Sequence, residues 1–249
     1  MQTAETQPTG FPLHSPIQYD VGITNHSIRA VFFDFDGTLV DSERLHYESW
    51  LDAVRPQGGH IEWPEYKQLL TGRSDREAGS LLLSRAGVEP TTDLVENACR
   101  IKTQRYKARF LDELTIEESV ASWIRKSPET MHVGVVTSSG EHEVAPILIK
   151  EDVRESLSLL VCGDQVQNLK PNPEPYLLAL ERATAAAQAH GHAPITRSEC
   201  LVLEDSEAGI TAARATGLRV AEVSSPGEVW GILTAEGLAD EPPRGDPLT

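Results

Sequence analysis

The sequence predicts an α/β fold of the Rossmann-like type, in which a doubly wound parallel sheet carries one inserted all-helical domain. Short apolar segments alternate with segments of helical periodicity, and strands that alternate with helices are typical of a parallel sheet. The segment before residue 34 has no polar alternation, as expected for a strand that is buried on both faces. Between about residues 41 and 128 the pattern is helical throughout, which predicts the insertion.

The expected strands are short apolar runs. They cover about residues 28–35, 131–137, 159–162, 200–203 and 219–223. In the insertion, apolar residues at helical spacing and punctuating glycines predict helices. These cover about residues 43–51, 64–71, 75–86, 92–111 and 116–126, and later helices cover about 143–150, 176–189 and 206–216. Ser42 is expected to cap the first helix, because a serine hydroxyl accepts a hydrogen bond from the first turn.

The domain organisation follows from these changes of pattern. Residues 1–27 are polar and proline-containing, which predicts a disordered or loosely packed arm. Residues 28–42 and 128–240 are expected to form the α/β core, and residues 43–127 the helical insertion. Residues 241–249 are expected to be a frayed tail.

Composition limits the possible functions. The formal net charge of −16 argues against nucleic acid and anionic membrane surfaces as partners. Three widely spaced cysteines indicate buried thiols and a reducing compartment. The sequence shows neither an apolar run long enough to span a bilayer nor a signal peptide. We therefore expect a cytoplasmic protein, and we expect a monomer.

Polar side chains follow four of the expected strands. Asp34 and Asp36 end the first, and Thr137 ends the second. Lys170 follows the third, and Glu204 with Asp205 ends the fourth. Each group alone has a simpler explanation as a turn, a solvated lysine or an acidic helix start. Together they converge, because the carboxyl ends of parallel strands form the ligand-binding edge of such a sheet.

The chemistry that suits this set is phosphoryl transfer. Asp34 is the candidate nucleophile, since a carboxylate can form an aspartyl phosphate. Asp36 is the candidate acid/base, because residues i and i+2 of a strand share a face. Lys170 would supply positive charge to the nucleophile and the phosphoryl group.

Magnesium is the expected cofactor, because it prefers oxygen ligands and takes one or two carboxylates with substrate phosphate. Asp34 and Asp205 are the expected pair, supported by a backbone carbonyl near Asp36 and by Glu204. Hydroxyl groups after the second strand would donate hydrogen bonds to phosphate oxygens. The expected donors are those of Thr137, Ser138 and Ser139.

Four motifs resemble those of the haloacid dehalogenase-like superfamily. They are DFDGTLVDS at residues 34–42, VVTSS at 135–139, KPNPEP at 170–175 and LEDSEAGI at 203–210. The resemblance implies that Asp34 is the nucleophile and Asp36 the general acid/base. It also implies that the helical insertion is a mobile cap, as in the branch that contains β-phosphoglucomutase and sugar-phosphate phosphatases.

Within the cap, the same resemblance implies substrate-binding residues. His46 stands where the mutases have a histidine near the substrate, and Gly72 with Arg73 resembles a loop that reaches into the active site. Lys102 resembles a lysine of the same branch. Arg76 is a further candidate contact for an anion.

This chain also departs from the mutases. They have Lys-Asn where this chain has Gly140 and Glu141, and their loop arginine directly follows a serine where this chain has Asp75 after Ser74. A mutase holds a bisphosphate in two orientations, so the missing cations weaken that interpretation. Haloacid dehalogenases lack the second aspartate, so Asp36 argues against dehalogenation.

The function expected from the sequence is a magnesium-dependent phosphatase that acts on a small phosphorylated metabolite, in particular a sugar phosphate. The alternative is a hexose-phosphate mutase of the same fold, which His46 and Lys102 favour. A non-catalytic metabolite-binding module is the third hypothesis, and the intact set of strand-end residues argues against it.

Overall fold

The structure, a computed structural model, describes residues 27–70 and 73–240. The tail expected at 241–249 and the expected arm, except for residue 27, therefore lie outside the described residues. In the described part of the chain, five parallel strands form one sheet in the order β3-β2-β1-β4-β5. They are β1 (Ala30–Phe33), β2 (His132–Val136), β3 (Leu159–Val161), β4 (Cys200–Glu204) and β5 (Arg219–Glu222). The predicted fold class is confirmed.

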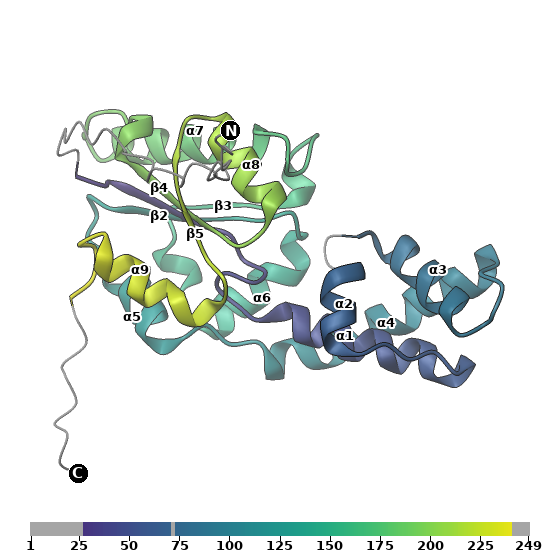
Figure 1. Ribbon diagram of the computed structural model, residues 1–249. Helices are drawn as coiled ribbons and strands as arrows, with labels where there is room; N and C mark the ends of the chain where they lie inside the picture. The colour runs from purple at the N-terminus through teal and green to yellow at the C-terminus, as the bar shows by residue number, and fades with distance from the viewer. Residues whose placement is uncertain (1–26, 71–72, 241–249) are drawn as a thin grey trace, which may run out of the picture.

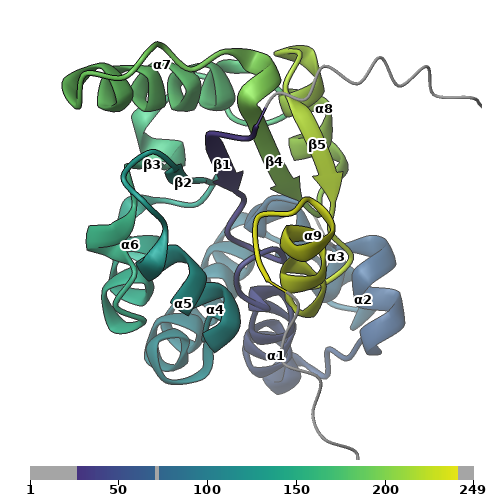
Figure 2. The same cartoon turned by 90° about the vertical axis from the view of Figure 1, so that its left-hand side faces the viewer.

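Helices cover both faces of the sheet (Figures 1 and 2). On one face lie α7 (Glu174–Ala189) and α8 (Glu207–Ala215), and on the other α5 (Glu118–Lys126), α6 (Glu141–Lys150) and α9 (Val229–Ala235). Short 3₁₀ turns cover Arg55–Gln57, Arg154–Ser156, Gly163–Gln165, Arg197–Glu199 and Pro226–Glu228. Among the described residues, no helix has both the length and the apolar character that a bilayer span requires.

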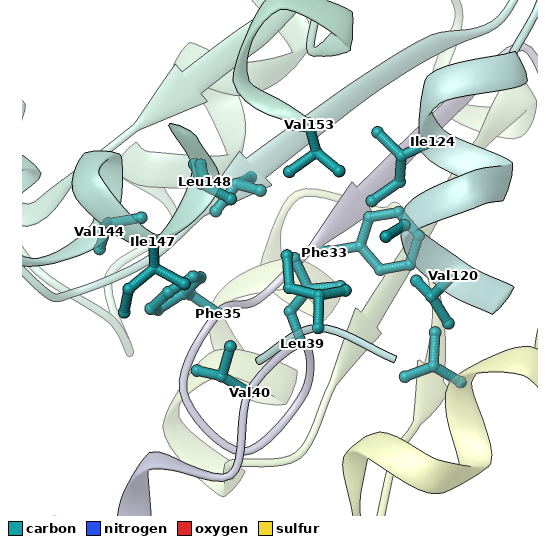
Figure 3. Close-up of a cluster of buried hydrophobic side chains, with 14 of the residues drawn as sticks. Phe33, Phe35, Leu39, Val40, Val120, Ile124, Val144, Ile147, Leu148 and Val153 are labelled. Atoms are coloured by element: carbon teal, nitrogen blue, oxygen red, sulfur yellow. The ribbon is translucent and has the colours of Figure 1, made fainter. Parts of the chain in front are cut away.

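The alternation of side chains along β1 explains the two layers. Ala30 and Phe32 belong to the buried cluster under α7 and α8, whereas Val31 and Phe33 belong to the cluster on the opposite face. Figure 3 shows the second cluster, where Phe33 lies among side chains of α5 and α6 such as Ile124 and Leu148. Truncating a buried phenylalanine costs about 3–5 kcal/mol, so this packing fixes the strand that carries the site.

Four further helices form a lobe beside the sheet (Figure 1). They are α1 (Ser42–Val54), α2 (Trp63–Leu69), α3 (Asp75–Arg85) and α4 (Thr92–Glu113). This lobe has its own apolar core, which includes Trp50, Tyr66 and Leu82. The α5 helix instead lies on the sheet, where the Trp123 ring packs edge-on against Phe33 with a centroid distance of 6.0 Å. We therefore propose that the insertion ends near residue 114, before α5, and not at 127.

Two local expectations differ from the structure. Ser42 does not cap α1: the N-cap residue is Asp41, and Ser42 lies in the first turn with its hydroxyl directed to Asp36. The α9 helix has no counterpart among the expected helices, because it is only seven residues long and buries only Val229 and Leu233.

Candidate active site

A tight turn after β1 places the two aspartates. The amide of Asp34 donates to the Leu203 carbonyl at 2.9 Å, which extends the pairing of β1 with β4 by one residue. Gly37 then adopts φ +86, a conformation that favours glycine. A Cβ atom on Gly37 would also lie 2.1 Å from Oδ2 of Asp205. The glycine therefore allows the loop that carries Asp36 to approach Asp205.

Lys170 is buried at the centre of the site. Its Nζ donates to Oδ1 of Asp34 at 2.6 Å, to the Val136 carbonyl at 2.9 Å and to Oε1 of Glu204. The side chains of Lys170, Asp34 and Glu204 are 4%, 9% and 0% exposed. Burial alone lowers the pKa of Lys170, but the charges of Asp34 and Glu204 outweigh it and raise the pKa, so the ammonium stays protonated.

Glu204 is held on both of its oxygens. The Tyr176 hydroxyl donates to Oε1 at 3.0 Å, beside Lys170, and the amide and hydroxyl of Ser206 donate to Oε2 at 3.1 and 3.0 Å. A Cβ atom on Gly209 would lie 1.7 Å from Oε1, so α8 can pack this closely only with glycine there. These contacts hold the Glu204 carboxylate in place beside Lys170.

Hydroxyl groups surround Asp36. Ser42 donates to Oδ1 and Ser139 to Oδ2, both at 2.6 Å, and the Thr137 hydroxyl lies 3.5 Å from Oδ2. The Ser139 amide in turn donates to the Thr137 hydroxyl at 3.0 Å. The site therefore orients Asp36 by hydroxyl donors from two places in the fold, the first turn of α1 and the loop between β2 and α6.

The carboxylates of this site repel one another. Burial raises the pKa of Asp34 well above its usual value, Lys170 opposes this, and the charges of Glu204 and Asp36 add to it. The pKa of Asp205 is raised to about 6, first by desolvation and then by the charge of Glu204. One oxygen from each of Asp34, Glu204 and Asp205 lies within 4.8 Å of the others. This acidic set suits a divalent cation, which would relieve the repulsion.

A cavity of about 440 Å³ separates this site from the helical lobe. Six of the residues proposed from the sequence line it: Asp36, His46, Arg73, Lys102, Ser138 and Ser139. Thr137 and Lys170 lie beneath, next to Asp36 and Asp34. Arg76 is turned away, 69% exposed and paired with Glu96 at 2.6 Å, and Gly72 lies outside the described residues.

His46 is a neutral ring in the cavity wall. It stacks on Tyr106 with a centroid distance of 4.3 Å and an interplanar angle of 5°. Burial first, and the charge of Lys102 second, lower the pKa of His46 to about 4. Its Nδ1 is buried and has no hydrogen-bond partner among the described residues.

Some contacts of the site were not expected from the sequence. Tyr176 has no polar neighbour in sequence that would mark it as a partner of Glu204. The Thr38 hydroxyl lies 3.4 Å from Oδ1 of Asp205, a contact that its place in the first motif did not indicate. For the hydrogen bond from Ser42 to Asp36, the only sequence signal was that Ser42 lies six residues after Asp36, close enough for its hydroxyl to reach the carboxylate.

A doubly wound α/β core with clustered carboxylates and a lysine at its strand ends, under a helical lobe, defines a class of hydrolases. Residues 31–223 match the family described as haloacid dehalogenase-like hydrolase. The chain belongs to this family, and the resemblance seen in the four motifs is confirmed.

Among its relatives, the fructose-1-phosphate phosphatase YqaB of Escherichia coli K12 is 29% identical over 197 residues, which are 78% of this chain and 95% of that protein. A phosphoglycolate phosphatase of Shigella boydii is 31% identical over 211 residues, 76% of this chain and 79% of that protein. The crystal structure of CbbY from Rhodobacter sphaeroides in complex with phosphate is 26% identical, with a TM-score of 0.60, and the match covers 78% of this chain and 84% of that one.

Proposed function

We propose that this protein is a magnesium-dependent phosphatase that hydrolyses a small phosphorylated metabolite, a sugar phosphate, through an aspartyl phosphate on Asp34. The main observation behind the proposal is that Asp34 is paired with the buried ammonium of Lys170. Two residues after Asp34, the carboxylate of Asp36 is oriented by the hydroxyl groups of Ser42 and Ser139. The relatives named as phosphatases of fructose 1-phosphate and phosphoglycolate support the same reaction class.

In the first half-reaction, an oxygen of Asp34 attacks phosphorus and the bond from phosphorus to the ester oxygen breaks. The leaving oxygen takes a proton from Asp36. Lys170 orients the nucleophile and offsets negative charge on the phosphoryl group. In the second half-reaction, Asp36 removes a proton from water, which attacks phosphorus and releases inorganic phosphate and the free Asp34 carboxylate.

Magnesium would be held by the carboxylates of Asp34 and Asp205 and by the backbone carbonyl of Asp36. Bound there, it supplies positive charge that offsets the repulsion between Asp34 and the phosphate. We assign Glu204 a positioning role instead, because donors occupy both of its oxygens and it holds Lys170 in place.

The cavity supports a small substrate. Its volume of about 440 Å³ lies within the range of small-molecule sites, and it opens between Asp36 of the core and His46, Arg73 and Lys102 of the lobe. We propose that the phosphoryl group binds near Asp36 and the Ser138–Ser139 segment, and that the remainder of the metabolite faces the lobe. Closure of the lobe would exclude water from the reacting phosphate.

The test is a phosphate-release screen over sugar phosphates, polyol phosphates, phosphoglycolate and nucleotides, with and without magnesium. The proposal expects magnesium-dependent release from one or a few sugar phosphates, and loss of turnover in Asp34→Asn. Intact mass spectrometry of acid-quenched protein should show a phosphoryl adduct that Asp34→Asn lacks. Full activity in a folded Asp34→Asn variant would refute the mechanism.

The same screen separates the mutase alternative. With a hexose 1-phosphate and a trace of bisphosphate, a mutase yields the 6-phosphate, whereas a phosphatase yields inorganic phosphate. Inertness toward the whole panel, despite magnesium binding, would instead favour a non-catalytic module.

A further inference from the structure

We propose that Asp75 selects against substrates that carry a second anionic group. By pairing with Lys102 in the cavity, it leaves the site suited to monophosphates whose remaining part is uncharged, such as a polyhydroxylated carbon chain. Bisphosphates and phosphorylated carboxylic acids would be disfavoured. This inference names the substrate class of the proposed phosphatase and rests on that function.

The ion pair uses both oxygens of Asp75. Nζ of Lys102 lies 2.8 Å from Oδ1 and 3.1 Å from Oδ2. The Lys102 side chain is only 9% exposed, and the rings of Trp50 and Tyr106 each lie 5.8 Å from the ammonium. A buried ammonium needs a counter-ion, and Asp75 supplies it from within the protein.

The position of Asp75 does not depend on a ligand. It is the first residue of α3, directly after Ser74, whose backbone amide and hydroxyl both donate to the Glu77 carboxylate in a capping box. The Asp75 carbonyl also accepts from the Cys99 thiol at 3.4 Å. The helix cap and the contact with α4 therefore hold the carboxylate against Lys102.

On the lobe side of the cavity, the described residues carry no excess of positive charge that could attract a second anionic group. Arg73 uses its Nε on the Leu69 carbonyl at 2.5 Å, and the cavity wall also carries the acidic Glu43. His46 is neutral above about pH 4. Among the described lining residues, the two cationic side chains, Arg73 and Lys102, are therefore equalled in number by two acidic ones of the lobe, Glu43 and Asp75. Asp36 of the core adds a third acidic side chain to the lining.

A second phosphate carries a charge of about −1.5 to −2 near neutral pH. To bind Lys102 it would have to displace Asp75, whose carboxylate would then face it as a like charge. A hydroxyl group meets no such barrier, because Asp75 is 44% exposed and can accept its hydrogen bond. The pair therefore separates substrates by the charge of the part that does not react.

The test replaces the charge and keeps the shape. Asp75→Asn frees Lys102 to bind an anion, and Asp93→Asn is the matched control, because Asp93 lies in the first turn of α4 and does not line the cavity. Affinities for fructose 1-phosphate and fructose 1,6-bisphosphate are measured calorimetrically in the Asp34→Asn background, and kcat/KM for both is measured with Asp34 intact.

We expect Asp75→Asn to shift the preference toward the bisphosphate at least tenfold, about 1.4 kcal/mol. Adding Lys102→Gln should remove the gain, and Asp93→Asn should leave the preference unchanged. A shift below twofold in a folded Asp75→Asn protein overturns the inference. If the protein hydrolyses these compounds but Asp75→Asn does not change the preference between them, only the role of Asp75 is refuted. If Asp75→Asn changes the binding preference but the protein hydrolyses neither compound, only the proposed function is refuted.

Discussion

Replacing Lys170 by methionine should remove the only cation that contacts both Asp34 and Glu204 among the described residues. The variant would leave two carboxylates, 9% and 0% exposed, without their ammonium partner. Breaking a buried pair in this way costs about 3–5 kcal/mol, because the remaining charge is neither solvated nor paired. We expect Lys170→Met to lower the free energy of unfolding by that amount near neutral pH.

Tyr176→Phe provides the matched comparison. It removes one donor from the same oxygen of Glu204 and keeps Lys170 in place. A hydrogen bond to a charged group contributes about 1.5–3 kcal/mol, so this variant should lose less stability than Lys170→Met.

The loss caused by Lys170→Met should depend on pH. The folded protein already raises the pKa of Asp34 above 3.8, and removing Lys170, whose charge lowers it, raises it further. A carboxyl group with a raised folded pKa binds its proton more tightly in the folded state, so stability falls as pH rises through that pKa. The difference between variant and wild type should therefore be largest at neutral pH and shrink toward acid.

The assay is urea unfolding in EDTA, followed by far-UV circular dichroism and tryptophan fluorescence. Coincident transitions and equal slopes allow the free energies to be compared. A Lys170→Met protein that is as stable as Tyr176→Phe would contradict the assigned role of the ammonium, as would a stability deficit that is the same at about pH 8 and about pH 5.

Three further predictions concern His46, Gly209 and the binding of magnesium. The buried His46 has a pKa of about 4 against 6.5 in the unfolded chain, so wild-type stability should fall by up to about 3 kcal/mol as pH drops across that range, and unfolding curves of His46→Phe should lack this component. Gly209→Ala should lower both stability and phosphatase activity, because the added Cβ meets Glu204, whereas Gly231→Ala in α9, with open space around it, should be neutral or stabilising by about 0.5–1 kcal/mol. Magnesium at about 100 times its dissociation constant should raise the free energy of unfolding by about 2.7 kcal/mol, and a thermal shift that persists in Asp205→Asn would contradict the assigned ligands.

The strand ends were predictable because two strong physical signals coincide there. Uninterrupted apolar runs define strands that are buried on both faces, and Asp34 and Glu204 interrupt them where burial of a charge is expensive. The alternation of strands with helices indicates a parallel sheet, and parallel strands place these residues at one edge of it. The fold class and the convergence of the acidic residues with Lys170 therefore follow from the sequence.

The partners of individual side chains could not be predicted from the sequence, because they depend on how the helices and strands pack in the tertiary structure. Tyr176 reads as an apolar position of α7 and reaches Glu204 only when that helix lies on the sheet. Asp75 and Lys102 are 27 residues apart on two helices, and spacing alone does not show that they meet. Ser42 fits both a helix cap and a ligand of Asp36, and only the turn at Gly37 decides between them.

Lys170 contacts three adjacent strands at once: Asp34 follows β1, Val136 ends β2 and Glu204 ends β4. In the chain, these residues are separated from Lys170 by 136, 34 and 34 positions. Lys170 therefore has all three partners, and is held against Asp34, only after β4 has joined β1. A partly assembled sheet would lack a competent nucleophile, so activity reports on completion of the core as directly as a spectroscopic probe would.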